Sequence, residues 1–241
     1  MTTHPDRVGT AQRVLDVWRA ELAPRTVRWS LLLSSADLEL SHDADRAVEA
    51  DGSLATLLAR QAVDASLPAD VVAQTLTHCA RAARPVGGLP SAVELAAAIR
   101  LLSGAETVND RLRRAGLRTR VAADGTGLLA PSEQAEAMAA LAGNPAYDVA
   151  LPCFVADAPL GLAAYLVADV SFWHAQGAGP TTRHDGGVLV TPDGADLGVY
   201  VHTEVAPSGP PTLDDPVLAA VGRAMARTVV LLGHPGLALQ V

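Results

Sequence analysis

The sequence predicts an α+β fold in which a mostly antiparallel sheet of hairpins carries amphipathic helices. Two patterns lead to this class. Apolar and polar residues alternate in several short segments that are separated by turn sequences, which is typical of hairpin strands. Longer segments repeat apolar residues every three or four positions, which is typical of helices that pack on one face. Hairpins outnumber strand–helix–strand units, so antiparallel pairing is favoured.

The N-terminal half is predicted to begin with a helix over residues 10–22, because Val14, Trp18 and Leu22 form one apolar stripe. A hairpin over 26–41 follows it. A helical block then spans residues 53–115, and Asp51 or Ser53 is expected to cap its first helix. The helices of this block are predicted at 53–65, 67–84, 91–103 and 105–115.

The C-terminal half is predicted to hold three further hairpins and two helices. Pro131 begins one helix, and Asp215 with Pro216 begins the last, over 216–232. Neither half shows a clear linker, so we expect a single domain over residues 1–241. The hairpin strands are predicted at 117–123 and 127–130, at 147–156 and 159–168, and at 187–191 and 197–204, with a long loop at 169–186.

Composition favours a folded protein with an apolar core, since 49% of residues are hydrophobic and only 18% are charged. The formal net charge of -8 argues against broad binding to DNA or to anionic lipid. The N-terminus lacks the apolar segment of a signal peptide, and Cys79 and Cys153 have no metal-site spacing. We therefore expect buried free thiols and a cytoplasmic location.

The apolar segment from Val149 to Ala168 has the length of a membrane span, but Asp157 and two prolines argue against one. Its pattern is an apolar strand with Pro152, a turn at Ala156-Asp157, then Gly161 in a second apolar strand. This hairpin resembles that of GAF-type sensory domains. The resemblance implies a module that senses a small molecule or dimerises, and it implies no catalytic residue.

Candidate ligand-binding residues gather in the predicted 169–186 loop, which is long enough to be functional. Trp173 and His174 are expected to line a pocket, and His184 with Asp185 has the chemistry for proton transfer. On the strand 197–204, Tyr200 and His202 share one face, which is either a ligand wall or a solvent-facing side. A flexible surface loop is the alternative interpretation of 169–186.

The sequence contains no Walker A, GxGxxG, HExxH or GxSxG motif and identifies no cofactor. Our leading hypothesis is therefore a non-enzymatic sensory or protein-interaction module. We expect it to form a homodimer through the first and last helices, and we predict no catalytic residue and no metal site.

Two alternatives remain open at this stage. One is a hydrolase or metal-dependent enzyme that joins His184 and Asp185 with His42 and Asp43. The other is a nucleic-acid-binding protein that uses a cluster of arginines, although such a cluster is more often a solvated face. The cluster comprises Arg111, Arg113, Arg114, Arg118 and Arg120.

Overall fold

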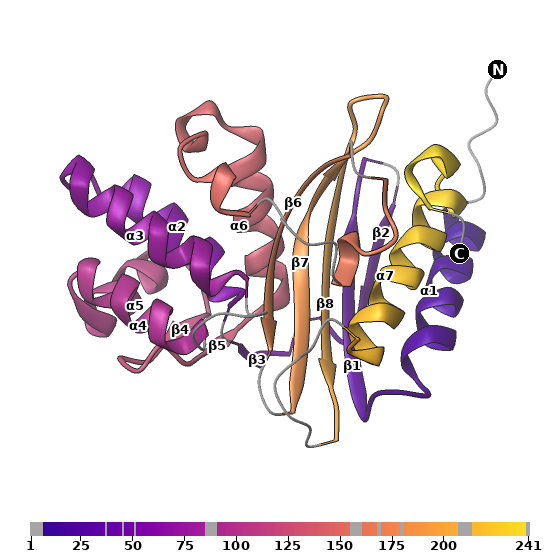
Figure 1. The fold of residues 1–241 in the computed structure, drawn as a ribbon, viewed down its shortest axis with the longest axis horizontal. Coiled ribbons are helices and arrows are strands. Elements are labelled where there is room, and N and C mark those ends of the chain that lie inside the picture. The colour runs from indigo at the N-terminus through magenta and orange to yellow at the C-terminus, as the bar shows by residue number, and fades with distance from the viewer. Residues whose placement is uncertain are drawn as a thin grey trace.

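A computed structural model describes residues 7–36, 38–44, 46–50, 52–84, 91–154, 161–167, 170–178, 181–206 and 214–239. A five-stranded antiparallel sheet stands between two helical layers (Figure 1). Each face of the sheet carries its own apolar core, one shared with the helical block and one with the terminal helices. The predicted α+β class is confirmed, and the single-domain organisation stays a prediction.

The sheet has the strand order β2-β1-β8-β7-β6, so its N-terminal and C-terminal strands meet in the middle. The strands are β1 (Arg28–Ser34), β2 (Glu39–His42), β6 (Ser171–Ala178), β7 (Thr182–Val190) and β8 (Asp196–Glu204). Side chains alternate between the faces along each strand. Val199 and Val201 therefore enter the core beneath the terminal helices, whereas Tyr200 enters the core beneath the helical block.

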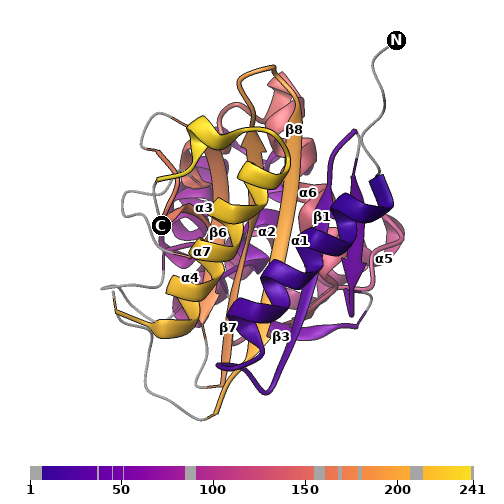
Figure 2. The same cartoon turned by 90° about the vertical axis from the view of Figure 1, so that its right-hand side faces the viewer.

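The terminal helices α1 (Arg7–Leu22) and α7 (Pro216–Leu231) lie side by side on one face of the sheet (Figure 2). Their apolar stripes, including Trp18 and Met225, are fully buried within the chain. The Trp18 indole N–H donates to the Thr228 hydroxyl over 2.9 Å. Because these stripes already cover the sheet, they are not available for the predicted homodimer, which stays a prediction.

The helical block covers the opposite face of the sheet (Figure 1). A small sheet of order β3-β5-β4 accompanies it. The predicted helices and the predicted hairpin after Gly116 are confirmed with small changes of boundary. The block contains α2 (Leu54–Asp64), α3 (Ala69–Ala82), α4 (Ser91–Leu101), α5 (Gly104–Arg114) and α6 (Pro131–Gly143), with β3 (Val48–Ala50), β4 (Arg120–Val121) and β5 (Gly127–Leu129).

The predicted hairpin at 147–168 is wrong. Its described residues form short 3-10 turns, at Pro145–Tyr147, Leu151–Phe154 and Gly161–Ala163, and a single bridge from Leu166 to Ala238. Prolines at the first or second position of two of these turns favour turns over a paired strand. The predicted turn at Ala156-Asp157 lies outside the described residues.

The predicted loop at 169–186 is also wrong, because its described residues form β6 and the first half of β7. These strands pair in register from Ser171–Val190 to Ala178–Arg183. The predicted strands 187–191 and 197–204 fall within β7 and β8. The described part of the segment thus belongs to the sheet, and five of its polar side chains are buried: His174, Gln176, Arg183, His184 and Asp185.

Candidate functional site

A short polar contact beneath the helical block joins Ser53 to His184. Ser53 directly precedes α2, where its hydroxyl is expected to cap the helix, but its side chain makes no capping hydrogen bond. Its Oγ instead lies 2.6 Å from Nδ1 of His184 and 3.4 Å from the carbonyl oxygen of Ala175. Both Ser53 and His184 are almost completely buried.

Tight backbone packing fixes Ser53 against β6, which is an edge strand of the sheet. A Cβ atom on Gly52 would lie 2.0 Å from the carbonyl oxygen of Gln176 and 2.6 Å from that of Ala82. The Gln176 N–H donates to the carbonyl of Ala83 over 3.2 Å. The start of α2, the end of α3 and β6 therefore meet at one point, and only glycine fits before Ser53.

A row of polar side chains continues from His184 across the sheet. His184, His202 and Ser30 are directly opposite one another on β7, β8 and β1 and so share a face. The rings of His184 and His202 are stacked with centroids 6.1 Å apart. Burial, followed by the nearby His184 and Arg46, lowers the pKa of His202 to about 3, so this ring is neutral near pH 7.

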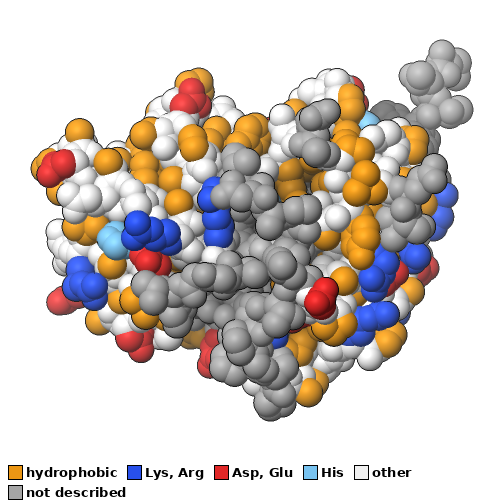
Figure 3. Space-filling view, in the orientation of Figure 1, with side chains coloured by type: hydrophobic (Ala, Val, Ile, Leu, Met, Phe, Trp, Pro, Cys, Tyr) orange, Lys and Arg blue, Asp and Glu red, His pale blue; other side chains and the backbone are white. Residues whose placement is uncertain are grey.

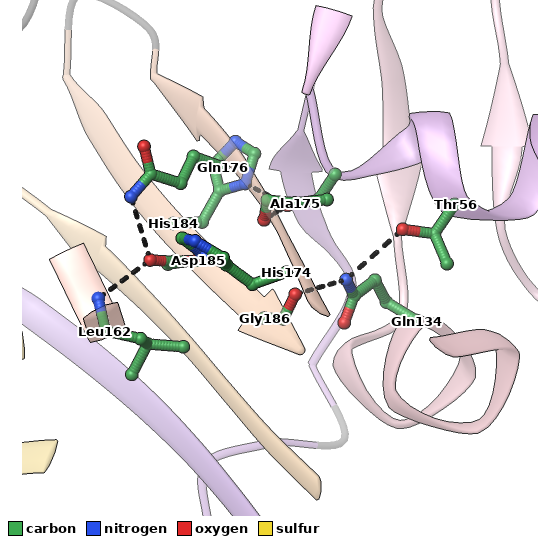
Figure 4. Close-up of polar contacts among 10 residues, drawn as sticks. Thr56, Gln134, Leu162, His174, Ala175, Gln176, His184, Asp185 and Gly186 are labelled. Atoms are coloured by element: carbon green, nitrogen blue, oxygen red, sulfur yellow. Dashed lines mark hydrogen bonds and ion pairs between the residues drawn. The ribbon is translucent and has the colours of Figure 1, made fainter. Parts of the chain in front are cut away.

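A second polar link joins the same face of the sheet to the helical block. The Gln134 amide of α6 donates to the Gly186 carbonyl over 3.2 Å and contacts the Thr56 hydroxyl at 3.5 Å (Figure 4). A Cβ on Gly186 would lie 2.5 Å from the Gln134 side-chain oxygen. Glycine at this position therefore allows the amide to approach the strand next to His184.

Asp185 belongs to the opposite face of the sheet. One carboxylate oxygen lies 2.8 Å from Nδ1 of His174. The other accepts hydrogen bonds from the Leu162 N–H over 2.8 Å and from the Gln176 amide over 3.0 Å (Figure 4). Asp185 is fully buried and His174 nearly so. This network fastens the 3-10 turn at Gly161–Ala163 to the sheet.

The structure therefore divides the five predicted ligand-binding residues between two faces. His184 and His202 lie beneath the helical block, where Trp173 also packs. His174 and Asp185 lie beneath α7, so the predicted proton-transfer pair of His184 and Asp185 is wrong. Tyr200 and His202 are buried, so the solvent-facing side is wrong for them, and the ligand wall stays a prediction.

Sequence reasoning identified Ser53 as a possible helix cap and missed its contact with His184. Ser53 and His184 are 131 positions apart, and no spacing rule connects a helix start to the fourth strand of a sheet. The available signal was a glycine–serine pair at the start of an apolar helix, a sequence that is also typical of ordinary caps.

The predicted joint site with His42 and Asp43 does not form. His42 is on β2, three strands from His184, which is about 14 Å at the usual strand spacing. His42 packs on Trp29 with ring centroids 4.2 Å apart, and Asp43 is paired with Arg28 at 2.7 Å. Among the described residues, no group of three or more His, Cys, Asp or Glu is placed to hold a metal ion.

Several arginines of the predicted nucleic-acid surface already have partners in the chain. Arg113 pairs with Asp110, Arg118 pairs with Glu133, and Arg120 donates to two backbone carbonyls. Charges of both signs are interspersed on the described surface in Figure 3. Nucleic-acid binding by this cluster stays an untested prediction.

Cys79 and Cys153 are buried free cysteines, as predicted, and burial raises the pKa of both thiols.

Within the described ranges, no helix combines the length and apolar character needed to span a bilayer. The cytoplasmic location stays a prediction.

A surface pocket of about 320 Å³ lies at the other end of the sheet, between the start of α1 and the turn before β8. It is lined by Arg13, Asp193 and His234 among others, and by none of the five predicted ligand-binding residues. One of its lining residues, Thr191, is seven positions along the chain from His184, which is about 24 Å in an extended strand. This pocket is therefore separate from the Ser53–His184 contact.

No protein-family model matches the sequence, and no curated protein matches it. Solved structures do match. A β-lactamase from Xanthomonas campestris has a TM-score of 0.72 at 15% identity, covering 91% of this chain and 98% of the other. One from Streptomyces albus G has a TM-score of 0.64 at 18% identity, covering 91% and 99%. The chain has the fold of these β-lactamases.

This match corrects the GAF resemblance and the interpretation built on it. The hairpin that carried the resemblance is absent from the described residues, and proteins that share nearly the whole fold are β-lactamases. The hypothesis of a non-enzymatic sensory or interaction module, which was built on the GAF resemblance, is therefore wrong as well. The hydrolase alternative is compatible with this fold, but the residues that it named do not come together.

The catalytic motifs of class A β-lactamases are a Ser-x-x-Lys sequence, an S-D-N sequence and a K-T-G sequence. This chain has none of them and contains no lysine. At the start of α2 it reads Ser53-Leu54-Ala55-Thr56, so Thr56 occupies the position at which the Ser-x-x-Lys motif has its lysine. A hydrolase built on Ser53 must therefore use a base other than lysine.

Proposed function

We propose that the protein is a serine hydrolase in which Ser53 is the nucleophile and His184 is its general base. The observation that carries this proposal is the 2.6 Å distance between Ser53 Oγ and His184 Nδ1. A hydroxyl within hydrogen-bond reach of an imidazole is the basic arrangement of an activated serine. The β-lactamase fold supports the same reaction class.

The reaction begins when Ser53 Oγ attacks a carbonyl carbon and its proton passes to Nδ1 of His184. For Nδ1 to accept that proton, the neutral ring carries its own proton on Nε2. The carbonyl electron pair moves to oxygen and then returns as the leaving group departs with the proton from His184. A water, deprotonated by His184, attacks the acyl-serine, releases the acid and restores Ser53.

The surroundings of Ser53 favour charge development during this step. Ser53 lies at the N-terminal end of α2, where the first backbone N–H groups of the helix point outward. The helix dipole places partial positive charge at this end. This charge stabilises the oxyanion that forms when Ser53 attacks. The site is also buried, and a low local dielectric strengthens these interactions.

The substrate class that this chemistry accepts is an activated carbonyl compound, either an ester or an amide, with β-lactams included among the amides. Because Ser53 is buried, a substrate reaches it only when neighbouring residues move apart. We therefore expect slow acylation and a preference for small acyl groups.

The decisive experiment is active-site labelling with a small fluorophosphonate, followed by peptide mass spectrometry. We expect modification at Ser53 and none in Ser53→Ala. His184→Gln is expected to slow labelling roughly 10²–10⁴-fold, which is the usual contribution of a general base. Ser41→Ala is the matched control, since Ser41 is exposed on the far edge strand β2, and it is expected to react like the wild type.

Turnover is measured in parallel with a chromogenic ester and a chromogenic β-lactam. Hydrolysis of either substrate that disappears in Ser53→Ala supports the proposal and identifies the acyl class. Absence of both labelling and turnover in folded wild-type protein overturns it. Labelling that persists unchanged in His184→Gln overturns the role of His184.

A further inference from the structure

His202 is an unusual residue to bury at its position in the sheet. It is 1% exposed, and among the described residues neither ring nitrogen has a hydrogen-bond partner of good geometry. A buried polar group without a well-placed partner destabilises the folded state. An apolar side chain would fill the same space without that cost, so a purely structural role does not explain a histidine here.

The neighbours of His202 come from three elements. His184 on β7 and Ser30 on β1 lie directly beside it in the sheet. Arg46, which precedes β3, adds a positive charge nearby, and the backbone of Glu49 on β3 offers a hydrogen bond to the ring. Glu204, two residues along β8, pairs with Arg46. His184 in turn contacts Ser53 on α2. His202 thus lies between the Ser53–His184 pair and an ion pair near the surface.

We propose that His202 is a positioning residue that stabilises the protonated form of His184. The inference rests on the proposed function, in which His184 becomes an imidazolium when it takes the Ser53 proton. A neutral imidazole has one N–H and one bare nitrogen, and an N–H directed to the backbone of Glu49 leaves the other ring nitrogen bare. The partial negative charge of this bare nitrogen stabilises the positive charge that forms on the neighbouring His184.

Two observations support this assignment. The rings of His184 and His202 are stacked with centroids 6.1 Å apart in a buried layer, where dipoles act strongly. Burial also holds the pKa of His202 near 3, so the residue adds no second positive charge beside His184 at neutral pH. A lysine or arginine at this position would oppose protonation of His184.

The test measures the pKa of His184 directly by NMR titration of labelled imidazoles, which needs no enzyme activity. Loss of the stabilising dipole in His202→Phe is expected to lower the pKa of His184 by about one pH unit. His202→Gln keeps a neutral donor and acceptor, so it is expected to restore part of the value. His42→Phe is the matched control, because His42 lies at the far edge of the sheet and stacks on Trp29.

The pH dependence of Ser53 labelling gives the second readout. In His202→Phe we expect the acidic limb of the labelling rate to move to lower pH and the maximal rate to fall about tenfold. A lower labelling rate with an unchanged pKa of His184 shows a structural role and overturns the inference. If His202→Phe does not fold, the pKa of His184 measured in His202→Gln decides. If wild-type Ser53 is never labelled, the proposed function fails, while the NMR result still decides whether His202 acts on His184.

Discussion

His184 and Asp185 are consecutive residues of β7, yet they serve two separate networks on opposite faces of the sheet. His184 contacts Ser53 beneath the helical block, and Asp185 contacts His174 and Leu162 beneath α7. The side-chain amide of Gln176 donates to Asp185, whereas its backbone N–H donates to the carbonyl of Ala83 in the helical block. The two faces are thus coupled through β6 and β7.

Replacing Asp185 with asparagine is expected to destabilise the protein by about 1–3 kcal/mol, the usual cost of leaving buried hydrogen-bonding groups without their partner. The asparagine amide would present N–H groups to donors that now face a carboxylate. Denaturant unfolding measures the change as a lower midpoint with an unchanged slope. Asp196→Asn, at the exposed start of β8, is the control and should change the midpoint little.

Gly52→Ala is expected to disrupt the start of α2, because its Cβ would lie 2.0 Å from a backbone carbonyl oxygen that cannot yield easily. We expect a loss of several kcal/mol in unfolding free energy and loss of Ser53 labelling. Gly143→Ala, at the exposed end of α6, meets nothing within 4 Å and serves as the matched control. It should be neutral or slightly stabilising. Equal melting temperatures for the two variants would contradict this packing.

Acid is expected to destabilise the protein through His202. Its pKa is about 3 in the folded state and near 6.5 when unfolded, so the unfolded chain binds the extra proton between these values. Above about pH 6.5 the titration of His202 does not reduce the free energy of unfolding. Below that pH it lowers this free energy as the pH decreases toward 3, by at most about 1.4 kcal/mol per pH unit. Urea unfolding from pH 7 to 4 checks this slope. His202→Gln should make it shallower, and an identical slope in that variant would refute the assignment.

The hydrogen bond between Trp18 and Thr228 is expected to contribute about 1 kcal/mol to the docking of α1 on α7. Trp18→Phe removes the donor, and Thr228→Val leaves the indole N–H buried without a partner. A double-mutant cycle in chemical denaturation isolates the pair, since the two residues are in direct contact. Strictly additive single changes would show that the contact contributes nothing.

Most helices and the strands with simple alternation were predictable because their patterns are local. The stripe of Val14, Trp18 and Leu22 and the cap at Asp215, which accepts from Val217 and Leu218, appear as expected. The segment after Gly143 was not predictable, because a short apolar run does not distinguish a strand from a buried turn. The polar sequence of β6 and β7 resembles a loop, and it forms buried strands only because tertiary partners satisfy its side chains.

The sequence by itself determined the α+β class, the terminal helices and the helical block, since each depends on contacts within a few residues or on the burial of one apolar face. Only the tertiary structure decided where the reactive groups meet. The strand order β2-β1-β8-β7-β6 brings His184 to Ser53 across 131 positions and sends Asp185 to the other face. Both outcomes depend on long-range pairing and register, where a shift of one residue would exchange the two faces.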